Sequence, residues 1–313
     1  MIRKSFYSFC ILFLTIGFDS YSSPQIAPDA AKIKEYAADI SSIRPFRNYR
    51  NISSLNKAAD FIHQTFLNFG YSPKRQYFQV DGSKYQNLEV RIGPVGSKKI
   101  VIGAHYDVAG DQEGADDNAS GVSALLEIAR IVKIREKNLT YEIILVAYSL
   151  EEPPFFRTDE MGSYVHAKSL KDKNENIELM ISLETIGYFS EADGSQEYPI
   201  FPMKWIYPNR GNFIAAVGRT KESKYLKILK NVFQNETDLP CETLIAPESL
   251  EGVDFSDHLN YWKFGYKALM ITDTAFLRNK NYHQKSDTMS TLNFNKIAET
   301  IRAILSLLLS DKI

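Results

Sequence analysis

Cysteine is scarce in this sequence, because the 313 residues include only Cys10 and Cys241. A chain of this length buries roughly 75% of its unfolded surface and needs no disulfide framework. An excess of charge of one sign is also absent, since 37 basic side chains face 38 acidic ones and the formal net charge is −1. This balance argues against a nucleic-acid partner, which would need clustered lysine and arginine. The chain also lacks repeats and low-complexity tracts, so the composition is that of an ordinary globular protein.

The apolar run at the N-terminus is too short to span a membrane. Arg3 and Lys4 precede an uncharged stretch at 5–18, which has the length of a signal-peptide core but not the ~20 residues of a spanning helix. We therefore predict that residues 1–23 are a signal peptide. A buried N-terminal element and a short uncleaved anchor are the alternatives. The prediction implies a secreted or periplasmic protein with no membrane association beyond this signal, and it leaves Cys241 unpaired.

Apolar strands alternate with amphipathic helices along the rest of the chain. Residues 99–104, 141–148 and 177–183 are apolar runs too short for helices, as is typical of buried strands. Their alternation with helices predicts an α/β fold with one mostly parallel twisted sheet and helices on both faces, a three-layer sandwich. Ligands in such folds bind at the carboxyl ends of the strands. Further strands are expected at 76–80, 87–92, 213–218 and 267–272, and helices at 29–43, 53–69, 121–136, 161–170, 222–234 and 294–310.

One long irregular segment interrupts this alternation. Residues 190–211 contain three prolines, two glycines and four aromatic residues. Irregular segments of this length in a compact domain often cover a functional site, and a decorative excursion is the alternative. We expect residues 24–313 to form a single catalytic domain in which this loop lies over the site.

Acidic and histidine side chains follow the predicted strands at the points where they end. A single such residue is a weak signal, but a cluster of histidines and carboxylates at one sheet edge points to a metal site. Carboxylate and imidazole ligands together suit zinc, with cobalt or manganese as substitutes. The residues are His105 and Asp107 after the first strand, Asp116 and Asp117 before the next helix, Glu151 and Glu152 after the second strand, Glu184 at the end of the third, and His283 and Asp287 before the last helix.

The segments around these residues resemble a known enzyme family. GAHYD, GADDNASG, LEEPPFFRTDEMGS, LETIGY, SDH and DTAFLRNKNYHQKSDT are similar to the co-catalytic di-zinc aminopeptidases typified by bacterial leucyl aminopeptidases. Glutamate carboxypeptidase II and the glutaminyl cyclases are more distant relatives. The resemblance runs from about residue 47 to the C-terminus. It implies a zinc exopeptidase fold, peptide substrates, two Zn²⁺ ions per chain that hold a hydroxide, and a glutamate general base.

The resemblance also implies a role for each residue of the cluster. His105, Asp117, Glu152, Glu184 and His283 would ligate the metals, with Asp117 as the bridge and a cis peptide after it. Which histidine shares a metal with Glu152 is left open, and Glu184 stands where an aspartate is usual. Glu151 would be the general base. Asp107 lies two residues after His105, on the same face of a strand end, and would hold the second imidazole nitrogen.

The charge of the proposed site fits this chemistry. Two zinc ions and three ligand carboxylates leave a charge of +1, which lowers the pKa of a bound water. One departure from the family concerns a tyrosine that helps to hold the tetrahedral intermediate in some members. This chain has Val253 at that position, so a donor is expected from 190–211 or from Tyr266. In the SDH motif, His258 either lines the site or follows a Ser256 or Asp257 helix cap.

Four functions are compatible with these motifs. An exported aminopeptidase is the leading hypothesis, and a carboxypeptidase or dipeptidase of the same family is the main alternative. A glutaminyl cyclase and a binding protein on an inactive peptidase scaffold are the others. A carboxypeptidase needs a cation for the substrate carboxylate, and the candidates for that cation are Arg157, Lys204, Arg210 and Arg278.

Overall fold

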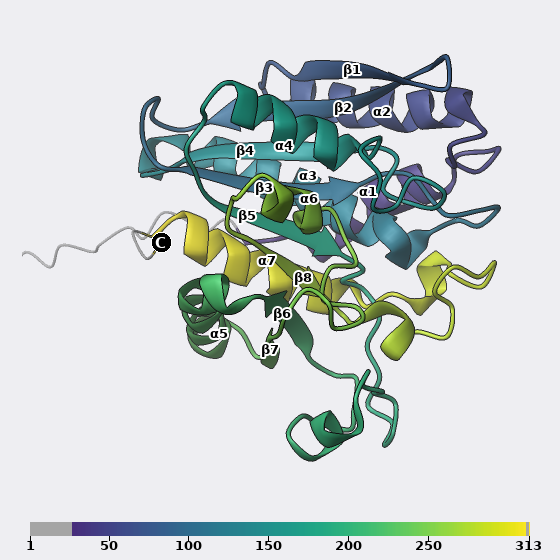
Figure 1. Ribbon diagram of the computed structural model, residues 1–313, viewed down its shortest axis with the longest axis vertical. Coiled ribbons are helices and arrows are strands. Elements are labelled where there is room, and N and C mark those ends of the chain that lie inside the picture. The colour runs from purple at the N-terminus through teal and green to yellow at the C-terminus, as the bar shows by residue number, and fades with distance from the viewer. Residues whose placement is uncertain (1–26, 311–312) are drawn as a thin grey trace, which may run out of the picture.

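The computed structural model describes residues 27–310 and 313, which include one eight-stranded sheet with helices on both faces (Figure 1). The strand order is β1-β2-β4-β3-β5-β8-β6-β7, and four of the seven pairings are parallel, as predicted for this α/β fold. The proposed signal peptide, 1–23, lies outside the described residues. The strands are β1 (Lys74–Val80), β2 (Ser83–Ile92), β3 (Lys99–His105), β4 (Glu142–Tyr148), β5 (Ile177–Glu184), β6 (Ile214–Gly218), β7 (Cys241–Ile245) and β8 (Ala268–Thr272).

Two layers of helices cover the sheet. Helices α4 and α6 pack on one face, in front of the sheet in Figure 1, and the other five helices form the layer behind it. No helix within the described part of the chain is long and apolar enough to cross a bilayer. The helices are α1 (Ala30–Ser41), α2 (Ile52–Asn68), α3 (Gly121–Ile134), α4 (Gly162–Asp172), α5 (Ser223–Glu236), α6 (His258–Lys263) and α7 (Phe294–Leu308).

The central strands carry apolar side chains on both faces because helices cover both faces of the sheet. Ile102 of β3 and Ile181 of β5 belong to the core beneath α1, α3 and α7. Val101 and Met180, one residue earlier on each strand, belong to the core beneath α4 and α6. This double burial anchors the carboxyl ends of β3, β4 and β5, where the polar cluster is found.

The far edge of the sheet differs from the sequence-based expectation. Strand β7 was not predicted, because the sequence of Cys241–Ile245 carries polar residues in place of an apolar run. It pairs in parallel with β6, while β6 runs antiparallel to β8. Residues of this edge, Phe213, Ala215, Val217 and Met270, lie on the face that α4 and α6 cover elsewhere.

Residues 190–211 form a projection between β5 and β6, seen at the bottom of Figure 1. Its two ends are joined by a backbone hydrogen bond from Ser190 to Gly211, and a second one links Gln196 to Asn209. A 3-10 turn, η3 (Phe201–Trp205), forms its tip. The segment is therefore an ordered excursion with backbone pairing at its base.

Candidate metal centre and active site

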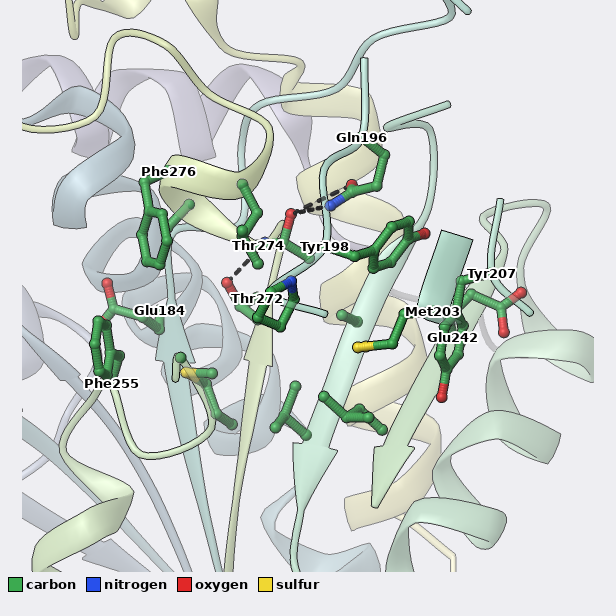
Figure 2. Close-up of a pocket in the computed structure, with 18 of the residues that line it drawn as sticks. Glu184, Gln196, Tyr198, Met203, Tyr207, Glu242, Phe255, Thr272, Thr274 and Phe276 are labelled. Carbon is green, nitrogen blue, oxygen red and sulfur yellow. Dashed lines mark hydrogen bonds between the residues drawn. The ribbon is translucent and has the colours of Figure 1, made fainter. Parts of the chain in front are cut away.

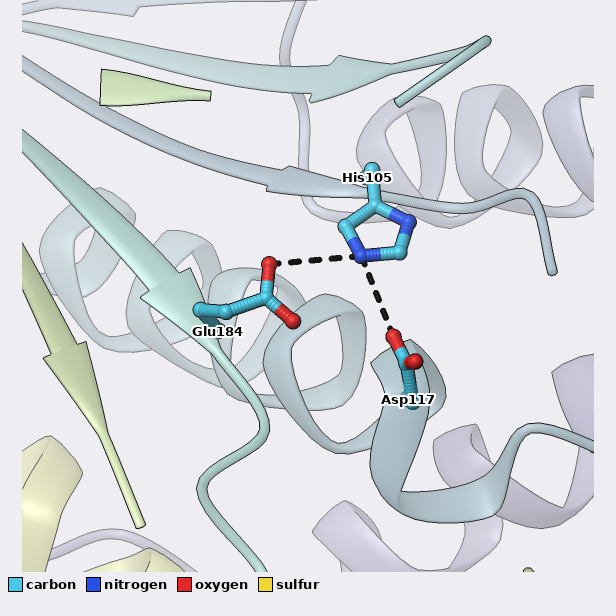
Figure 3. A group of neighbouring side chains, drawn as sticks. All are labelled: His105, Asp117 and Glu184. Atoms are coloured by element: carbon cyan, nitrogen blue, oxygen red, sulfur yellow. Dashed lines mark ion pairs between the residues drawn. The ribbon is translucent and has the colours of Figure 1, made fainter. Parts of the chain in front are cut away.

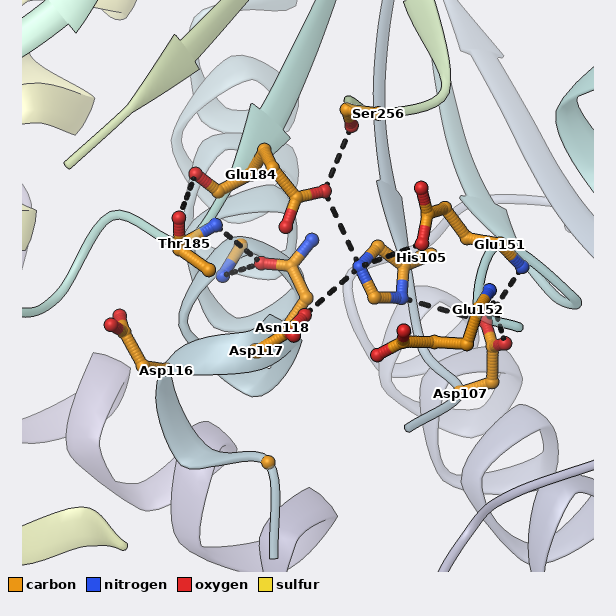
Figure 4. A network of polar contacts seen from close by, with 12 residues as sticks. His105, Asp107, Asp116, Asp117, Asn118, Glu151, Glu152, Glu184, Thr185 and Ser256 are labelled. Carbon is orange, nitrogen blue, oxygen red and sulfur yellow. Dashed lines mark hydrogen bonds and ion pairs between the residues drawn. The ribbon is translucent and has the colours of Figure 1, made fainter. Parts of the chain in front are cut away.

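The carboxyl ends of β3, β4 and β5 bring the polar residues of the sequence motifs together (Figure 4). His105 is the last residue of β3 and Glu184 the last residue of β5. Glu151 and Glu152 follow the end of β4, and Asp117 lies on η1 (Ala115–Ser120), the turn that leads from β3 into α3. All five side chains are buried. The edge is thus a buried acidic pocket with an imidazole at its centre.

Three of these side chains form a first group around His105 (Figure 3). The His105 Nε2 atom lies 3.3 Å from Asp117 Oδ1 and 3.3 Å from Glu184 Oε2. The three atoms come from β3, η1 and β5 and point to one spot. The extra methylene of Glu184, compared with the usual aspartate, is accommodated without displacing its carboxylate from this group.

A second group forms on the other side of the same aspartate. The His283 Nε2 atom lies 3.0 Å from Asp117 Oδ2 and 3.2 Å from Glu152 Oε2. Asp117 therefore presents one oxygen to each imidazole. In this group Glu152 lies beside His283, although Glu152 also belongs to a third possible set with His105 and Glu151.

Within the described part of the chain, several polar atoms of the two groups lack the hydrogen bonds that buried polar atoms normally have. Among the described residues, no hydrogen-bond partner is found for His105 Nε2, His283 Nε2, Glu152 Oε1 or either oxygen of Asp117. Leaving so many buried polar atoms unpaired is costly unless another group satisfies them. Imidazole nitrogens and carboxylate oxygens are the atoms that bind zinc. The residues therefore fit metal ions, with one position in each group.

Burial and charge perturb the titration of these side chains in the metal-free protein. Burial raises the pKa of Glu152 to about 8, and the Asp117 carboxylate adds to the rise. Burial opposes protonation of His283, but Asp117 and Glu152 outweigh it and raise the pKa of His283 to about 11. Burial also raises the pKa of Glu184. Without metal, the cluster therefore holds protons at neutral pH that a metal ion would displace.

Glu151 stands apart from the two groups. Its Oε2 atom is 3.9 Å from His105 Nε2, which is longer than the contacts to Asp117 and Glu184. A third set of possible ligands, His105, Glu151 and Glu152, shares His105 with the first group and Glu152 with the second. Burial raises the pKa of Glu151 well above its usual value, so this carboxyl can hold a proton near neutral pH. Position and pKa both favour a proton-transfer role over ligation.

The carboxylates of Asp107 and Asp287 each accept hydrogen bonds from the backbone N–H groups of two neighbouring acidic residues. The Asp107 carboxylate accepts hydrogen bonds from the N–H groups of Glu151 (3.2 Å) and Glu152 (3.1 Å). Its Oδ1 atom is 3.5 Å from His105 Nδ1, close to the nitrogen that the sequence analysis assigned to it. Asp287, which the sequence analysis placed in the same cluster, accepts hydrogen bonds from the N–H groups of Asp116 (2.9 Å) and Asp117 (3.1 Å). The peptide bond after Asp117 is cis, as the resemblance implied.

The SDH motif contributes differently from either expectation. Ser256 donates a hydrogen bond to Glu184 Oε2 at 2.8 Å, so it orients a member of the first group. Asp257 begins α6, but its side chain makes no capping hydrogen bond. His258 contacts the Val253 carbonyl oxygen at 2.8 Å and packs on Trp262, so the expectation that it lines the site is wrong.

The donor that was expected from 190–211 or from Tyr266 is not Tyr266. In 190–211 the hydroxyls of Tyr198 and Tyr207 donate to backbone carbonyl oxygens. Tyr266 donates to the Glu175 carbonyl oxygen, just before the start of β5 and at the opposite end of that strand from Glu184. Tyr282, which sequence reasoning missed, stacks on His283 with ring centroids 3.9 Å apart. Its hydroxyl has no hydrogen-bond partner among the described residues, and it lies next to the cluster carboxylates, which together with burial raise its pKa well above 10. Its place directly before a metal-site histidine was the only available signal.

A cavity that is lined mainly by apolar side chains adjoins the cluster (Figure 2). Glu184 forms part of its wall at one end, and Tyr198, Met203 and Tyr207 from the excursion form the other end. Phe213, Ala215, Val217 and Met270 line it along β6 and β8. The excursion thus encloses a cavity next to the site, and does not lie across the metal cluster itself.

The four cations considered for carboxylate binding do not line this cavity. Arg157 pairs with Asp254 and Arg210 with Asp193. Arg278 is buried, donating to Gln196 and to the Tyr188 carbonyl oxygen, and Lys204 is exposed on the excursion. Among the described residues, no lysine or arginine lines the cavity, whereas Glu184, Glu242 and Glu251 do.

Comparison with known proteins identifies the family of this chain. The profile of Peptidase family M28 matches residues 87–308. The chain is 40% identical to the uncharacterized protein YfbL of Escherichia coli K12, over 99% of this chain and 100% of that protein. It is 22% identical to leucine aminopeptidase 1 of Blastomyces gilchristii, over 94% of this chain and 75% of that protein.

Two solved structures show the same fold. The LapA aminopeptidase of Legionella pneumophila superposes with a TM-score of 0.69 at 18% identity, covering 90% of this chain and 71% of that one. The glutaminyl cyclase of Bacteroides thetaiotaomicron, bound to N-acetylhistamine, gives 0.68 at 18% identity, covering 91% and 99%. Since enzymes of two reaction types share the fold, the fold alone does not select the reaction.

Proposed function

The chain belongs to peptidase family M28, and from that premise we propose that it is a two-zinc aminopeptidase that removes N-terminal residues from peptides. The observation that carries the proposal is the position of Asp117. Its two oxygens face two separate imidazole–carboxylate pairs, 3.3 Å from His105 and 3.0 Å from His283. A cyclase that uses one metal would not need the second group.

The chain's own residues assign the metal positions. His105, Asp117 and Glu184 would hold one zinc ion, and His283, Asp117 and Glu152 the other. Bound zinc supplies Lewis acidity, which makes water more acidic and polarises the scissile carbonyl group. Cobalt or manganese would suit the same ligands. Asp107 and Asp287 fix the backbones that carry the acidic ligands, and Ser256 fixes the Glu184 carboxylate.

Glu151 moves the proton in this scheme. Its carboxylate would accept a proton from the attacking water and then deliver it to the leaving amine. Burial raises the pKa of Glu151 in the metal-free protein, and the charge of bound metal ions would lower it again, so that the carboxylate can accept the proton and pass it on. Asp107 keeps Glu151 in position through the backbone N–H of that residue.

Tyr282 supplies a hydrogen-bond donor for the developing oxyanion. The raised pKa of its phenol keeps it protonated at the pH of catalysis. Stacking on His283 holds the ring in the wall of the cavity, beside the proposed metal positions. A donor preorganised in this way stabilises charge that appears only in the transition state.

The charges around the cavity favour a free amine over a free carboxylate as the recognised terminus. The charged side chains that line it are all acidic, and among the described residues no cation reaches it. Glu184 is a proposed metal ligand and Glu242 is paired with Lys230, and a substrate carboxylate would find no cationic partner in this lining. This distinction supports an aminopeptidase over a carboxypeptidase.

We also propose that the enzyme acts outside the cytoplasm on peptides, without a nucleic-acid partner and without membrane association beyond its export signal. The cationic start and the uncharged stretch at 5–18 support export.

A substrate panel tests the reaction type. We expect the zinc-loaded protein to cleave leucine p-nitroanilide, to lose activity with phenanthroline and to recover it with added zinc. Cleavage of N-acetyl-leucine p-nitroanilide or of a benzyloxycarbonyl dipeptide would contradict the aminopeptidase assignment. Ring closure of a glutaminyl peptide without cleavage, followed by mass spectrometry, would select the cyclase. Failure to act on any of these substrates would select the inactive scaffold.

A further inference from the structure

The turn that follows Glu184 has an unusual backbone conformation. Glu184 is the last residue of β5, and the next residue, Thr185, has a φ angle of +44°, in the left-handed region. This conformation is rare for a β-branched residue, because its side chain crowds the backbone there. Such a conformation persists only where the surrounding contacts hold it. The position of the Glu184 carboxylate therefore depends on the contacts that hold Thr185.

The Asn118 side chain holds the backbone on both sides of Glu184. Its Nδ2 atom donates to the Leu183 carbonyl oxygen at 2.8 Å, and its Oδ1 atom accepts a hydrogen bond from the Thr185 N–H group at 3.2 Å (Figure 4). Asn118 is completely buried and directly follows Asp117 in η1. One amide group thus connects the segments that carry two members of the first metal group.

Two more side chains of η1 bond to the backbone of the same turn. Ser120 Oγ accepts from the Ile186 N–H group at 3.1 Å, and Asp116 Oδ1 accepts from the Gly187 N–H group at 2.9 Å. Both partners lie just after Glu184 in the chain. The turn after β5 is therefore fixed to η1 by side chains from alternate residues, with Asn118 at the centre.

The start of α3 approaches this junction so closely that Gly121 has no room for a side chain. A Cβ atom at Gly121 would lie 2.7 Å from the Leu183 carbonyl oxygen and closer still to the Asn118 amide oxygen. The Gly121 N–H group donates to that amide oxygen at 3.1 Å. The Asn118 amide is therefore enclosed between α3 and the end of β5, where it has little freedom to move.

The second metal group is held by a different contact. Asp287, four residues after His283, accepts from the N–H group of Asp117 at 3.1 Å and so ties Asp117 to the segment of that histidine. Within the described residues, the hydrogen bonds of the Asn118 side chain do not reach this segment. The two groups share Asp117 but are positioned by separate supports, which separate substitutions can remove.

We propose that Asn118 is a positioning residue for the first metal group, and that it sets the separation of the Asp117 and Glu184 carboxylates by holding the turn after β5. This inference rests on the two-zinc site of the proposed function. Without the amide, the N–H group of Thr185 would lose its partner, and the turn would relax toward an ordinary backbone conformation. The Glu184 carboxylate would then leave its place beside His105, and the first group alone would bind metal more weakly.

Calorimetric zinc titration tests this selectivity. In N118L, whose side chain is close in size but forms no hydrogen bond, we expect one of the two zinc ions to bind ~10-fold to 100-fold more weakly and the other to bind as before. Single-site variants assign the weakened ion. N118L should lower the zinc affinity of H283A, in which the first group remains, and leave that of E184A unchanged.

N48L is the matched control. Asn48 is also completely buried, donates to the Gly110 carbonyl oxygen at 3.0 Å and accepts from the Arg50 N–H group at 3.2 Å, but it does not contact β5. We expect both zinc ions to bind N48L as they bind the unaltered protein. If N118L does not fold, S120A removes one hydrogen bond of the same junction and should weaken the same ion by a smaller factor.

The outcomes separate this inference from the function on which it rests. Equal weakening of both ions by a folded variant, or no weakening of either, would overturn the role of Asn118, because a residue that only supports folding affects both groups alike. Neither result depends on peptidase activity. A protein that binds two zinc ions but cleaves no peptide would contradict the proposed function, and the titration would still support or overturn the role of Asn118.

Discussion

The metal cluster and the neighbouring cavity differ in how their polar atoms are paired. The metal cluster lies at the ends of parallel strands β3, β4 and β5, and it buries charged atoms that have no hydrogen-bond partner among the described residues. The neighbouring cavity lies over β6, β7 and β8, where strand directions are mixed, and most of its lining is apolar. The cluster leaves polar atoms unpaired, as a metal site would, whereas the hydroxyls of Tyr198 and Tyr207 in the cavity are bonded within the protein.

We expect the largest effect on activity when the proton-transfer group of the cluster, Glu151, is removed. E151Q should lower kcat by ~10³-fold or more, because the amide cannot carry a proton from water to the leaving amine. Two metal ions per chain should remain by elemental analysis, since Glu151 belongs to neither ligand group. E160Q, at an exposed position of the same loop, is the control. Retained turnover in E151Q would remove it as the base.

A smaller effect is expected at Tyr282, where cluster and cavity meet. Y282F should reduce kcat by ~10²-fold with little change in KM, because the hydroxyl would act only on the transition state. Y266F removes a hydroxyl that bonds to Glu175 and should leave both constants unchanged. If Y282F raised KM and left kcat unchanged, Tyr282 would contribute to substrate binding in the cavity and not to the chemical step.

Asp107 tests how far the cluster depends on its supporting hydrogen bonds. D107N keeps one acceptor oxygen but loses the second, so one of the N–H groups of Glu151 and Glu152 would lose its bond. We expect zinc affinity to fall by ~10-fold to 100-fold, the usual effect of removing such a support. Calorimetric zinc titration measures this, with D238N at an exposed position as the control. Unchanged affinity would reduce Asp107 to a residue of local folding.

The smallest predicted effect is the pH dependence of folding stability, which involves residues of the cluster and not those of the cavity. Without metal, Glu152 has a pKa of about 8, above its unfolded value of ~4.3, so stability falls as the pH rises between the two. The pKa of His283 is raised to about 11, so its contribution is complete below ~6.5 and is lost as the pH rises towards 11. Both trends have the same sign. Zinc displaces these protons, and its stabilisation should therefore grow with pH.

Differential scanning fluorimetry measures this trend. We expect zinc to raise the melting temperature by ~5 °C more at pH 8 than at pH 5.5. H283A, which removes one imidazole ligand, should abolish most of the difference, and M203A should not affect it. An equal zinc effect at both pH values would show that the protons assigned to Glu152 and His283 are not linked to metal binding.

The cluster could be read from the sequence because its geometry is local to strand ends. An apolar run followed at once by His105 or Glu184 places that residue at the carboxyl edge of a parallel sheet. Asp107 could be assigned because it lies two residues from His105. The role of Asp287 could not, since it acts on the N–H groups of Asp116 and Asp117, about 170 residues earlier in the chain.

The cavity could not be read in the same way. It depends on β7, whose sequence lacks an apolar run, and on the antiparallel placement of β6, which reverses the expected direction of the edge. Met203 and Trp205 have similar apolar character in the sequence, and only the three-dimensional path of η3 turns one inward and the other outward. Irregular segments are not constrained by a repeat, so side-chain direction within 190–211 could not be predicted.

The central claim is that Asp117 bridges two metal ions while Glu151 stays off both. Crystals of the zinc-loaded protein, measured on both sides of the zinc absorption edge, test it directly. We predict two anomalous peaks, one among His105, Asp117 and Glu184 and the other among His283, Asp117 and Glu152, with Glu151 outside both. A single peak, or a peak that Glu151 ligates, would contradict the account.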